Sequence, residues 1–272
     1  MLTESFQSIA TAARRLLQNW KALIVLAVLY AGLLASLYLF VTTREATTSQ
    51  VALTLLLAIV SPFLFFLIQT AGACQVRTLG PIGLLKESLK SVWKVVTVSL
   101  PLIALTILVL YLLGKAQNYT GAVTPDLSNV PYQIGSQNAD TRSLPLSTTL
   151  LTAIRYLFIG LALPILAVHL WIASTKDGLL STIKRSRRIF VGAFAPNSVL
   201  IYITGFLAFG VLPYLILFKA TPATSVWLEF GLFVGRLAFV FVLTLIGWVV
   251  TVSALAESAH QFPAEPTSES LQ

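Results

Sequence analysis

The chain has 272 residues, of which 57% are hydrophobic and only 10% are charged, and its net charge is +8. In soluble domains roughly a quarter of the residues are charged, so a water-soluble fold is excluded, and a lipid bilayer accounts for the missing polar shell. The positive residues lie in short segments beside long apolar runs, which favours anionic lipid headgroups, and not nucleic acid, as their partner.

The first element is an amphipathic N-terminal segment followed by a long apolar run. The apolar residues of the segment recur at the three- and four-residue spacing of a helix, at Phe6, Ile9, Ala13, Leu16 and Trp20. The apolar run that follows has about 20 residues, which is longer than the hydrophobic part of a signal peptide, and no small-residue cleavage motif follows it. We therefore expect a first transmembrane helix that stays in the mature protein.

Six apolar runs are long enough to cross the hydrocarbon core, for which roughly 20 residues are needed. They cover residues 22–41, 51–73, 95–114, 148–172, 197–218 and 228–255. The predicted fold is an all-α membrane protein with a single polytopic domain over residues 1–258. The polar connection 115–147 shows no helical or strand period and is either a flexible loop or a small external cap. Residues 259–272 form a polar tail that we expect to be disordered.

The distribution of Lys and Arg predicts the orientation, because cytoplasmic loops carry an excess of positive residues. One set of alternate connections holds twelve of these residues, and the opposite set holds four: Arg44, Lys115, Arg142 and Lys219. The N-terminus is therefore predicted to be cytoplasmic, and six spans return the C-terminus to the same side. The expected location is the cytoplasmic (inner) membrane.

Two segments on the predicted cytoplasmic side match each other at an offset of 95 residues. The matches pair Gly83-Leu84-Leu85 with Gly178-Leu179-Leu180, Lys90-Ser91 with Arg185-Ser186, and Pro101 with Pro196. Each segment has the pattern of an amphipathic helix, with apolar positions at Leu85, Leu89, Val92 and Val96 and at Leu179, Ile183 and Phe190. Together with the N-terminal segment they predict three repeated units, each an interfacial amphipathic helix followed by a transmembrane hairpin.

Signals for helix starts accompany both segments. Pro81 suits the first turn of the earlier helix, and Ser174 with Asp177 has the spacing of a capping box before the later one. Pro101 and Pro196 lie near the cytoplasmic start of their spans, where each either kinks its helix or simply opens it.

The second half of the chain carries a resemblance to a known family. It rests on the stretch around Leu163-Pro164, Asp177-Gly178-Leu179-Leu180 and Ser186-Arg187-Arg188-Ile189-Phe190. This stretch resembles the six-helix integral membrane domain attached to some bacterial glycerophosphodiester phosphodiesterases, and related uncharacterised bacterial membrane proteins. In that family the catalytic part is a separate soluble barrel, so the resemblance implies a connection with lipid physiology and no activity for the membrane domain.

Arg155 and Arg236 lie inside otherwise apolar spans, which makes them the most costly residues to place in lipid. Both lie toward the external end of their helix, in the similar strings Arg155-Tyr156-Leu157-Phe158 and Arg236-Leu237-Ala238-Phe239. Three interpretations are open. Each side chain reaches the outer headgroups, or both converge on an anion such as a lipid phosphate, or each pairs with a backbone carbonyl or an acid such as Glu229.

The densest group of cations consists of Lys184, Arg185, Arg187 and Arg188, beside the apolar positions of the later amphipathic segment. A cation near an anionic leaflet contributes roughly 1 kcal/mol. This pattern predicts contact with anionic headgroups on the cytoplasmic side, either as general attraction to the leaflet or toward a specific lipid or protein partner.

Two further patterns concern helix packing. Gln69 and His169 lie in the inner halves of their spans, where an isolated polar residue is expected to hydrogen-bond a neighbouring helix. Gly231 and Gly235 form a GxxxG pattern, which permits close helix approach, and we expect that approach within the chain.

Sequence signatures of enzymes are missing: HExxH, a P-loop, a dinucleotide-binding glycine run and a Ser-His-Asp arrangement. Cys74 is the only cysteine, and His169 and His260 are the only histidines, so neither a metal site nor a cofactor is expected. The leading hypothesis is a non-enzymatic multi-pass protein that binds membrane lipids or a membrane or cytoplasmic protein partner. The alternative is a transporter or channel for a small anionic or lipidic solute, with Arg155 and Arg236 at its outer mouth.

Overall fold

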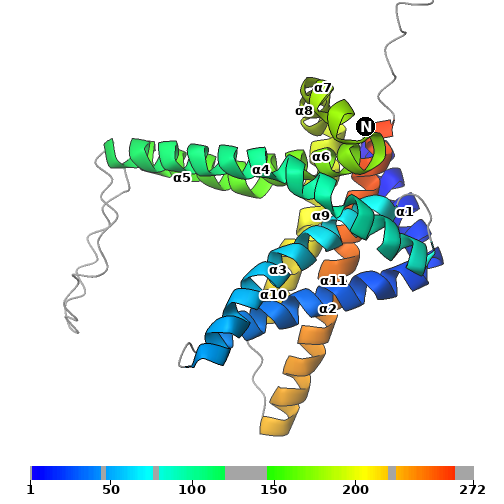
Figure 1. Cartoon of the computed structure of the whole chain (residues 1–272), viewed down its shortest axis with the longest axis vertical. Coiled ribbons are helices and arrows are strands. Elements are labelled where there is room, and N and C mark those ends of the chain that lie inside the picture. The colour runs from blue at the N-terminus through cyan, green and yellow to red at the C-terminus, as the bar shows by residue number, and fades with distance from the viewer. Residues whose placement is uncertain (1, 44–46, 76–79, 120–145, 220–224, 261–272) are drawn as a thin grey trace, which may run out of the picture. The chain divides into compact units, whose positions relative to one another are not determined.

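The computed structural model describes residues 2–43, 47–75, 80–119, 146–219 and 225–260, in which every regular element is helical (Figure 1). The α-helices are α1 (Leu2–Gln18), α2 (Trp20–Thr42), α3 (Thr48–Gln75), α4 (Pro81–Tyr119), α5 (Leu146–Leu157), α6 (Leu163–Asp177), α7 (Leu179–Lys184), α8 (Ser186–Ala193), α9 (Pro196–Phe206), α10 (Leu212–Phe218) and α11 (Val226–His260). Two π-helical segments, η2 (Phe158–Ala162) and η3 (Leu207–Val211), follow α5 and α9.

Six helices of the described chain are long and apolar enough to cross a membrane. They cover Trp20–Thr42, Thr48–Gln75, Pro81–Tyr119, Thr149–Asp177, Pro196–Phe218 and Val226–Ser258. The all-α class and the six predicted apolar helices are thereby confirmed. They fit a multi-pass membrane protein, because an α-helix satisfies its backbone hydrogen bonds internally and can therefore exist in lipid.

The chain divides into two compact units, one formed by Met1–Ser99 with Ile165–Gln272 and the other by Leu100–Pro164. The smaller unit contains the second half of α4, then α5 and η2. Within it, Gln117 Nε2 near the end of α4 donates a 3.4 Å hydrogen bond to Thr152 Oγ1 of α5. The larger unit contains α1, α2, α3, the first half of α4 and the helices from α6 to α11.

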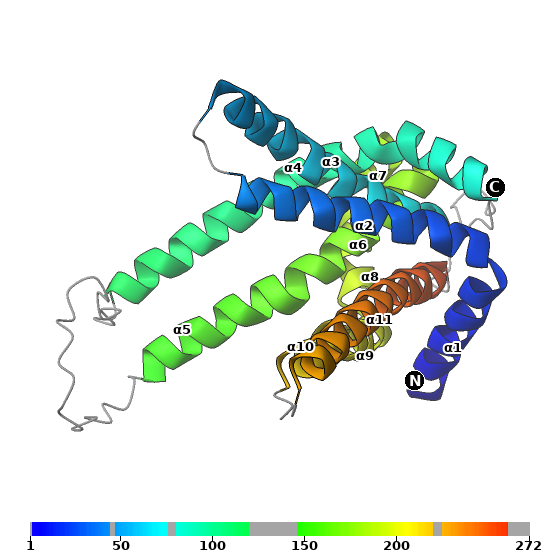
Figure 2. The same cartoon turned by 90° about the horizontal axis from the view of Figure 1, so that it is seen from below.

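In the larger unit, α11 is the helix against which most others pack. It contacts α9, α10 and α3, while α1 lies against α11 and α9, and α2 and α3 form a hairpin (Figures 1 and 2). α9 lies close against α11, where a Cβ atom on Gly205 would stand 2.6 Å from Thr251 Cγ2 and nearer still to Thr251 Oγ1. A Cβ on Gly247 of α11 would stand 2.9 Å from Phe209 Cβ. Small residues at these contacts let the backbones approach, which favours helix association in lipid.

The GxxxG contact predicted for Gly231 and Gly235 is wrong for the described part of the chain. A Cβ atom added to either glycine would have no described atom within 4 Å. Both lie in the stretch of α11 from Val226 to Phe239, which is exposed apart from the half-buried Arg236. The residues that bring helices together are instead Gly205 and Gly247, which no short motif marks.

The faces that pack inward share only part of the predicted apolar stripes. From Ser5 onward, the buried side chains of α1 are Ser5, Ser8, Ala12 and Leu16, and those of the first half of α4 include Leu84, Ser88, Ser91, Val92 and Val95. In contrast, Phe6, Trp20, Leu85 and Leu89 are exposed. Lipid is as apolar as the protein interior, so large apolar side chains gain little by turning inward, and small residues take the helix contacts.

Several predicted helix boundaries also differ. The second predicted interfacial helix and the third span are one helix, α4, which starts at Pro81 as predicted and continues through Pro101. The last predicted interfacial helix is divided at Arg185 into α7 and α8. Pro196 opens α9 at its first turn.

The predicted capping box of Ser174 and Asp177 is wrong. Both residues belong to α6, and Ser174 Oγ donates a 3.0 Å hydrogen bond to the Trp171 carbonyl of the same helix. The start of α7 is instead set by Gly178, whose φ of 83° is a conformation that favours glycine and that interrupts the helix after Asp177.

Candidate functional site

The four predicted headgroup ligands lie together on α7 and α8. We call Lys184, Arg185, Arg187 and Arg188 the basic cluster, and all four are exposed. Arg185 Nη1 lies 4.0 Å from Asp177 Oδ2, with side chains 62% and 37% exposed, so this ion pair contributes little. All four side chains of the basic cluster are therefore accessible from the surroundings of the protein.

Large apolar side chains adjoin the basic cluster. Leu180, Ile183, Phe190 and Val191 are between 52% and 77% exposed. On the same two helices, Thr182 and Ala193 are buried, so α7 and α8 each have an inward side. Cations and exposed apolar side chains on one short helical pair are typical of segments that lie at a lipid–water interface.

Arg155 and Arg236 belong to different units. Arg155 lies exposed on α5 in the smaller unit. Arg236 lies half-buried on α11 in the larger unit, and its Nη1 donates a 2.5 Å hydrogen bond to the carbonyl of Lys219, which follows α10. A cation at this position complements the negative end of the α10 dipole. This contact matches the backbone-carbonyl interpretation for Arg236, and the shared anion site remains a prediction.

The polar residues inside the spans form hydrogen bonds, as predicted. Gln69 Oε1 of α3 accepts a 3.0 Å hydrogen bond from Trp248 Nε1 of α11. His169 Nδ1 lies 2.9 Å from the Ile165 carbonyl of its own helix, and its Nε2 lies 3.4 Å from Ser198 Oγ of α9. Each polar group thereby gains a partner in place of water, which ties α3 to α11 and α6 to α9.

Trp248→Phe is expected to lower the free energy of unfolding by about 1 kcal/mol. The substitution removes the indole N–H that donates a hydrogen bond to the side chain of buried Gln69. The measurement is the unfolding midpoint of the purified protein in a mild detergent. Trp227→Phe is the matched control, since Trp227 is 83% exposed. Equal losses in the two variants would contradict a specific role for the Trp248 hydrogen bond.

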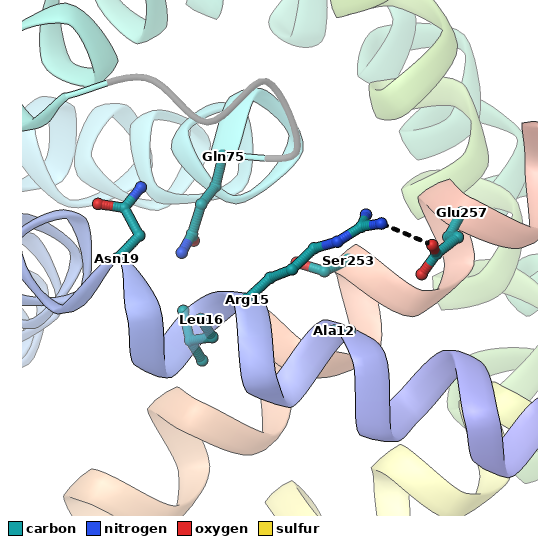
Figure 3. A pocket seen from close by; sticks show the side chains of 7 residues that line it. All are labelled: Ala12, Arg15, Leu16, Asn19, Gln75, Ser253 and Glu257. Atoms are coloured by element: carbon teal, nitrogen blue, oxygen red, sulfur yellow. Dashed lines mark ion pairs between the residues drawn. The ribbon is translucent and has the colours of Figure 1, made fainter.

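The structure adds a site that sequence reasoning missed. A cavity of about 40 Å³ lies where α1 ends beside the last turns of α3 and α11 (Figure 3). Its lining consists of Ala12, Arg15, Leu16, Asn19, Gln75, Ser253 and Glu257. Within it, Arg15 Nη2 lies 3.3 Å from Glu257 Oε1. These residues are far apart in the sequence, and their only common signal is that each polar one lies at or near the end of an apolar run.

Gln75 has an unusual environment in this cavity. Its side chain is only 8% exposed, and its Oε1 has no hydrogen-bond partner among the described residues. A buried polar atom without a partner costs about 1–3 kcal/mol, so such atoms mark positions where a further donor fits. Ser91 Oγ is the other such atom in the described part of the chain, but it does not line the cavity.

Comparisons of the chain with models of protein families, with curated proteins and with solved structures find no match. The function is therefore inferred from features of the chain itself. These are the six apolar helices, the basic cluster with its apolar neighbours, and the polar cavity at the ends of α1, α3 and α11.

Proposed function

We propose that the protein is a non-enzymatic, multi-pass component of the cytoplasmic membrane that holds anionic lipid headgroups against its cytoplasmic face. The observation that carries this proposal is the basic cluster on α7 and α8, with four exposed cations next to exposed Leu180, Ile183, Phe190 and Val191. The cations attract headgroups, each contributing roughly 1 kcal/mol, and the apolar side chains enter the acyl boundary.

The other two predicted units support the same role. α1 exposes Phe6 and Leu17, α2 begins with the exposed Trp20, and the start of α4 exposes Ile82, Leu85 and Trp93. Lysines or arginines lie among these side chains at Arg14, Lys86 and Lys90. We propose that all three segments contact the same leaflet, as the repeat at an offset of 95 residues and the resemblance to a phosphodiesterase membrane domain suggest.

Lipid retention tests the proposed function. The protein is reconstituted with equal amounts of phosphatidylglycerol and phosphatidylcholine, extracted in mild detergent, and the retained lipids are quantified by mass spectrometry. We expect phosphatidylglycerol to be enriched several-fold at low salt and less so at high salt, because salt screens exposed charges. Equal retention of both lipids at low salt would refute the proposal.

Cysteine labelling tests the proposed orientation. In a Cys74→Ala background, Lys90→Cys and Lys115→Cys place single thiols at two exposed positions of α4. The two positions are 25 residues apart, which is about 37 Å along a helix and more than the hydrocarbon core of about 30 Å. A membrane-impermeant maleimide is expected to label only Lys115→Cys in intact cells, and Lys90→Cys after permeabilisation. Labelling of both from one side would overturn the orientation.

A further inference from the structure

The cavity between α1, α3 and α11 has the composition of a ligand site that is separate from the basic cluster. We propose that it binds a primary ammonium group, supplied by the headgroup of phosphatidylethanolamine in the adjoining leaflet. The proposal goes beyond the function proposed above, because it involves a zwitterionic lipid and none of the cluster residues.

The depth of the cavity places it among lipid headgroups. Asn19 directly precedes the apolar helix Trp20–Thr42, Gln75 ends Thr48–Gln75, and Glu257 lies in the last turn of Val226–Ser258. Three apolar spans therefore reach their boundary at the level of this cavity. In a bilayer this is the level of phosphates and ammonium groups, whereas the acyl chains lie deeper.

The hydrogen-bonding groups of the cavity call for a donor with positive charge. Figure 3 shows the Gln75 amide directed from α3 toward Leu16 of α1 and toward Asn19, which lies between α1 and α2. Its Oε1 is buried and has no partner among the described residues, so it can accept one hydrogen bond from a ligand. Gln75 is the last residue of α3, so the negative end of the helix dipole lies beside this oxygen. The Glu257 carboxylate lines the same cavity, where it is paired with Arg15. An ammonium group carries three donors and one positive charge, which satisfies both requirements.

The size of the cavity and the position of Arg15 select the headgroup. About 40 Å³ admits a few water-sized groups, which fits –NH₃⁺ and its first methylene. The Arg15 guanidinium beside it is 58% exposed and can meet the phosphate of the same headgroup. The Arg15–Glu257 ion pair is thus complementary to a zwitterion with a phosphate and a primary amine.

The test compares two lipids that carry the same charges. Delipidated wild-type protein in detergent is titrated with short-chain phosphatidylethanolamine or phosphatidylcholine, and its melting temperature is recorded. We expect the ethanolamine lipid to raise the melting temperature more, because choline has no N–H donor. Gln75→Leu and Glu257→Gln are each expected to weaken the apparent affinity for phosphatidylethanolamine roughly tenfold, the usual loss for one hydrogen bond to a charged group. Gln7→Leu, at an exposed glutamine of α1, is the matched control and should bind as the wild type does.

The possible results of the lipid titration can be told apart. Gln75→Leu removes a buried atom without a partner, so the variant is expected to fold at least as stably as the wild type without lipid. Stabilisation by free ethanolamine at similar strength would support the ammonium site and assign its source to a soluble amine. Equal stabilisation of the wild type by both lipids, or an unchanged preference in both cavity variants, would overturn the proposal. The difference between the two lipids should persist when the basic cluster is reversed, so the failure of one proposal is separable from that of the other.

Discussion

Reversal of the basic cluster, with Lys184, Arg185, Arg187 and Arg188 all changed to Glu, is expected to abolish the preferential retention of phosphatidylglycerol. Removal of four attractive charges costs about 4 kcal/mol at roughly 1 kcal/mol each, which is about a thousandfold in relative affinity, and the new carboxylates add repulsion. All four side chains are exposed, so the fold should tolerate the change. The measurement is the ratio of phosphatidylglycerol to phosphatidylcholine that remains with the purified variant.

A matched control separates the basic cluster from general attraction to the leaflet. Arg14, Lys86, Lys90 and Lys94 lie on the same predicted side of the membrane, on α1 and α4, and their reversal changes the net charge by the same amount. Because these cations lie on segments that we propose to contact the same leaflet, this variant should lose part of its preference for phosphatidylglycerol. If α7 and α8 form the main headgroup site, that loss is smaller than the loss in the basic-cluster variant. Equal losses in both variants would assign the attraction to overall charge and remove the special role of the basic cluster.

The second large effect is expected for Gly205→Leu, which should lower the free energy of unfolding by about 3 kcal/mol. Gly205 is buried in α9, where even a Cβ atom would stand 2.6 Å from Thr251 Cγ2 of α11, and its larger side chain can enter only if the two helices separate. Because α11 also contacts α1, α3 and α10, the separation disturbs the main packing of the larger unit. Unfolding in detergent, followed by circular dichroism, measures the loss.

Gly231→Leu is the control for this substitution. It makes the same chemical change in a membrane-spanning helix, at a position where an added Cβ would meet no described atom within 4 Å. The variant should be as stable as the wild type or slightly more so, because leucine has the higher helix propensity. A loss as large as that of Gly205→Leu would show that Gly231 faces a partner, such as a second copy of the chain.

The number and class of the helices could be predicted from the sequence because they depend on one quantity, the length of an apolar run relative to the thickness of the bilayer. Runs such as 22–41 and 197–218 differ from Trp20–Thr42 and Pro196–Phe218 only at their ends. The continuity of the helix from Lys94 to Val95 could not be predicted. The basic amphipathic segment and the apolar span form one helix, α4, because both have the same backbone geometry and only their side chains differ.

The inward faces and the cavity were not predictable for a different reason. In water a large apolar side chain marks the buried face of a helix, but in lipid it is equally well placed outside, as Leu85 and Leu89 are. The buried face is then marked by residues such as Ser88 and Ser91, which also occur widely on exposed surfaces. The pairing of Arg15 with Glu257 depends on how α1 packs against α11, which no local pattern in either segment indicates.

The length of α11 has a mechanical consequence. Its 35 residues rise about 52 Å, and even a steep tilt of about 40° leaves a projection of about 40 Å, well beyond the hydrocarbon thickness of about 30 Å. One or both ends must therefore extend past the acyl chains. In a thicker membrane Glu257 would lie closer to the hydrocarbon core, and in a thinner membrane it would lie farther out in the aqueous phase. The thickness of the membrane can therefore set how well the Glu257 carboxylate is hydrated.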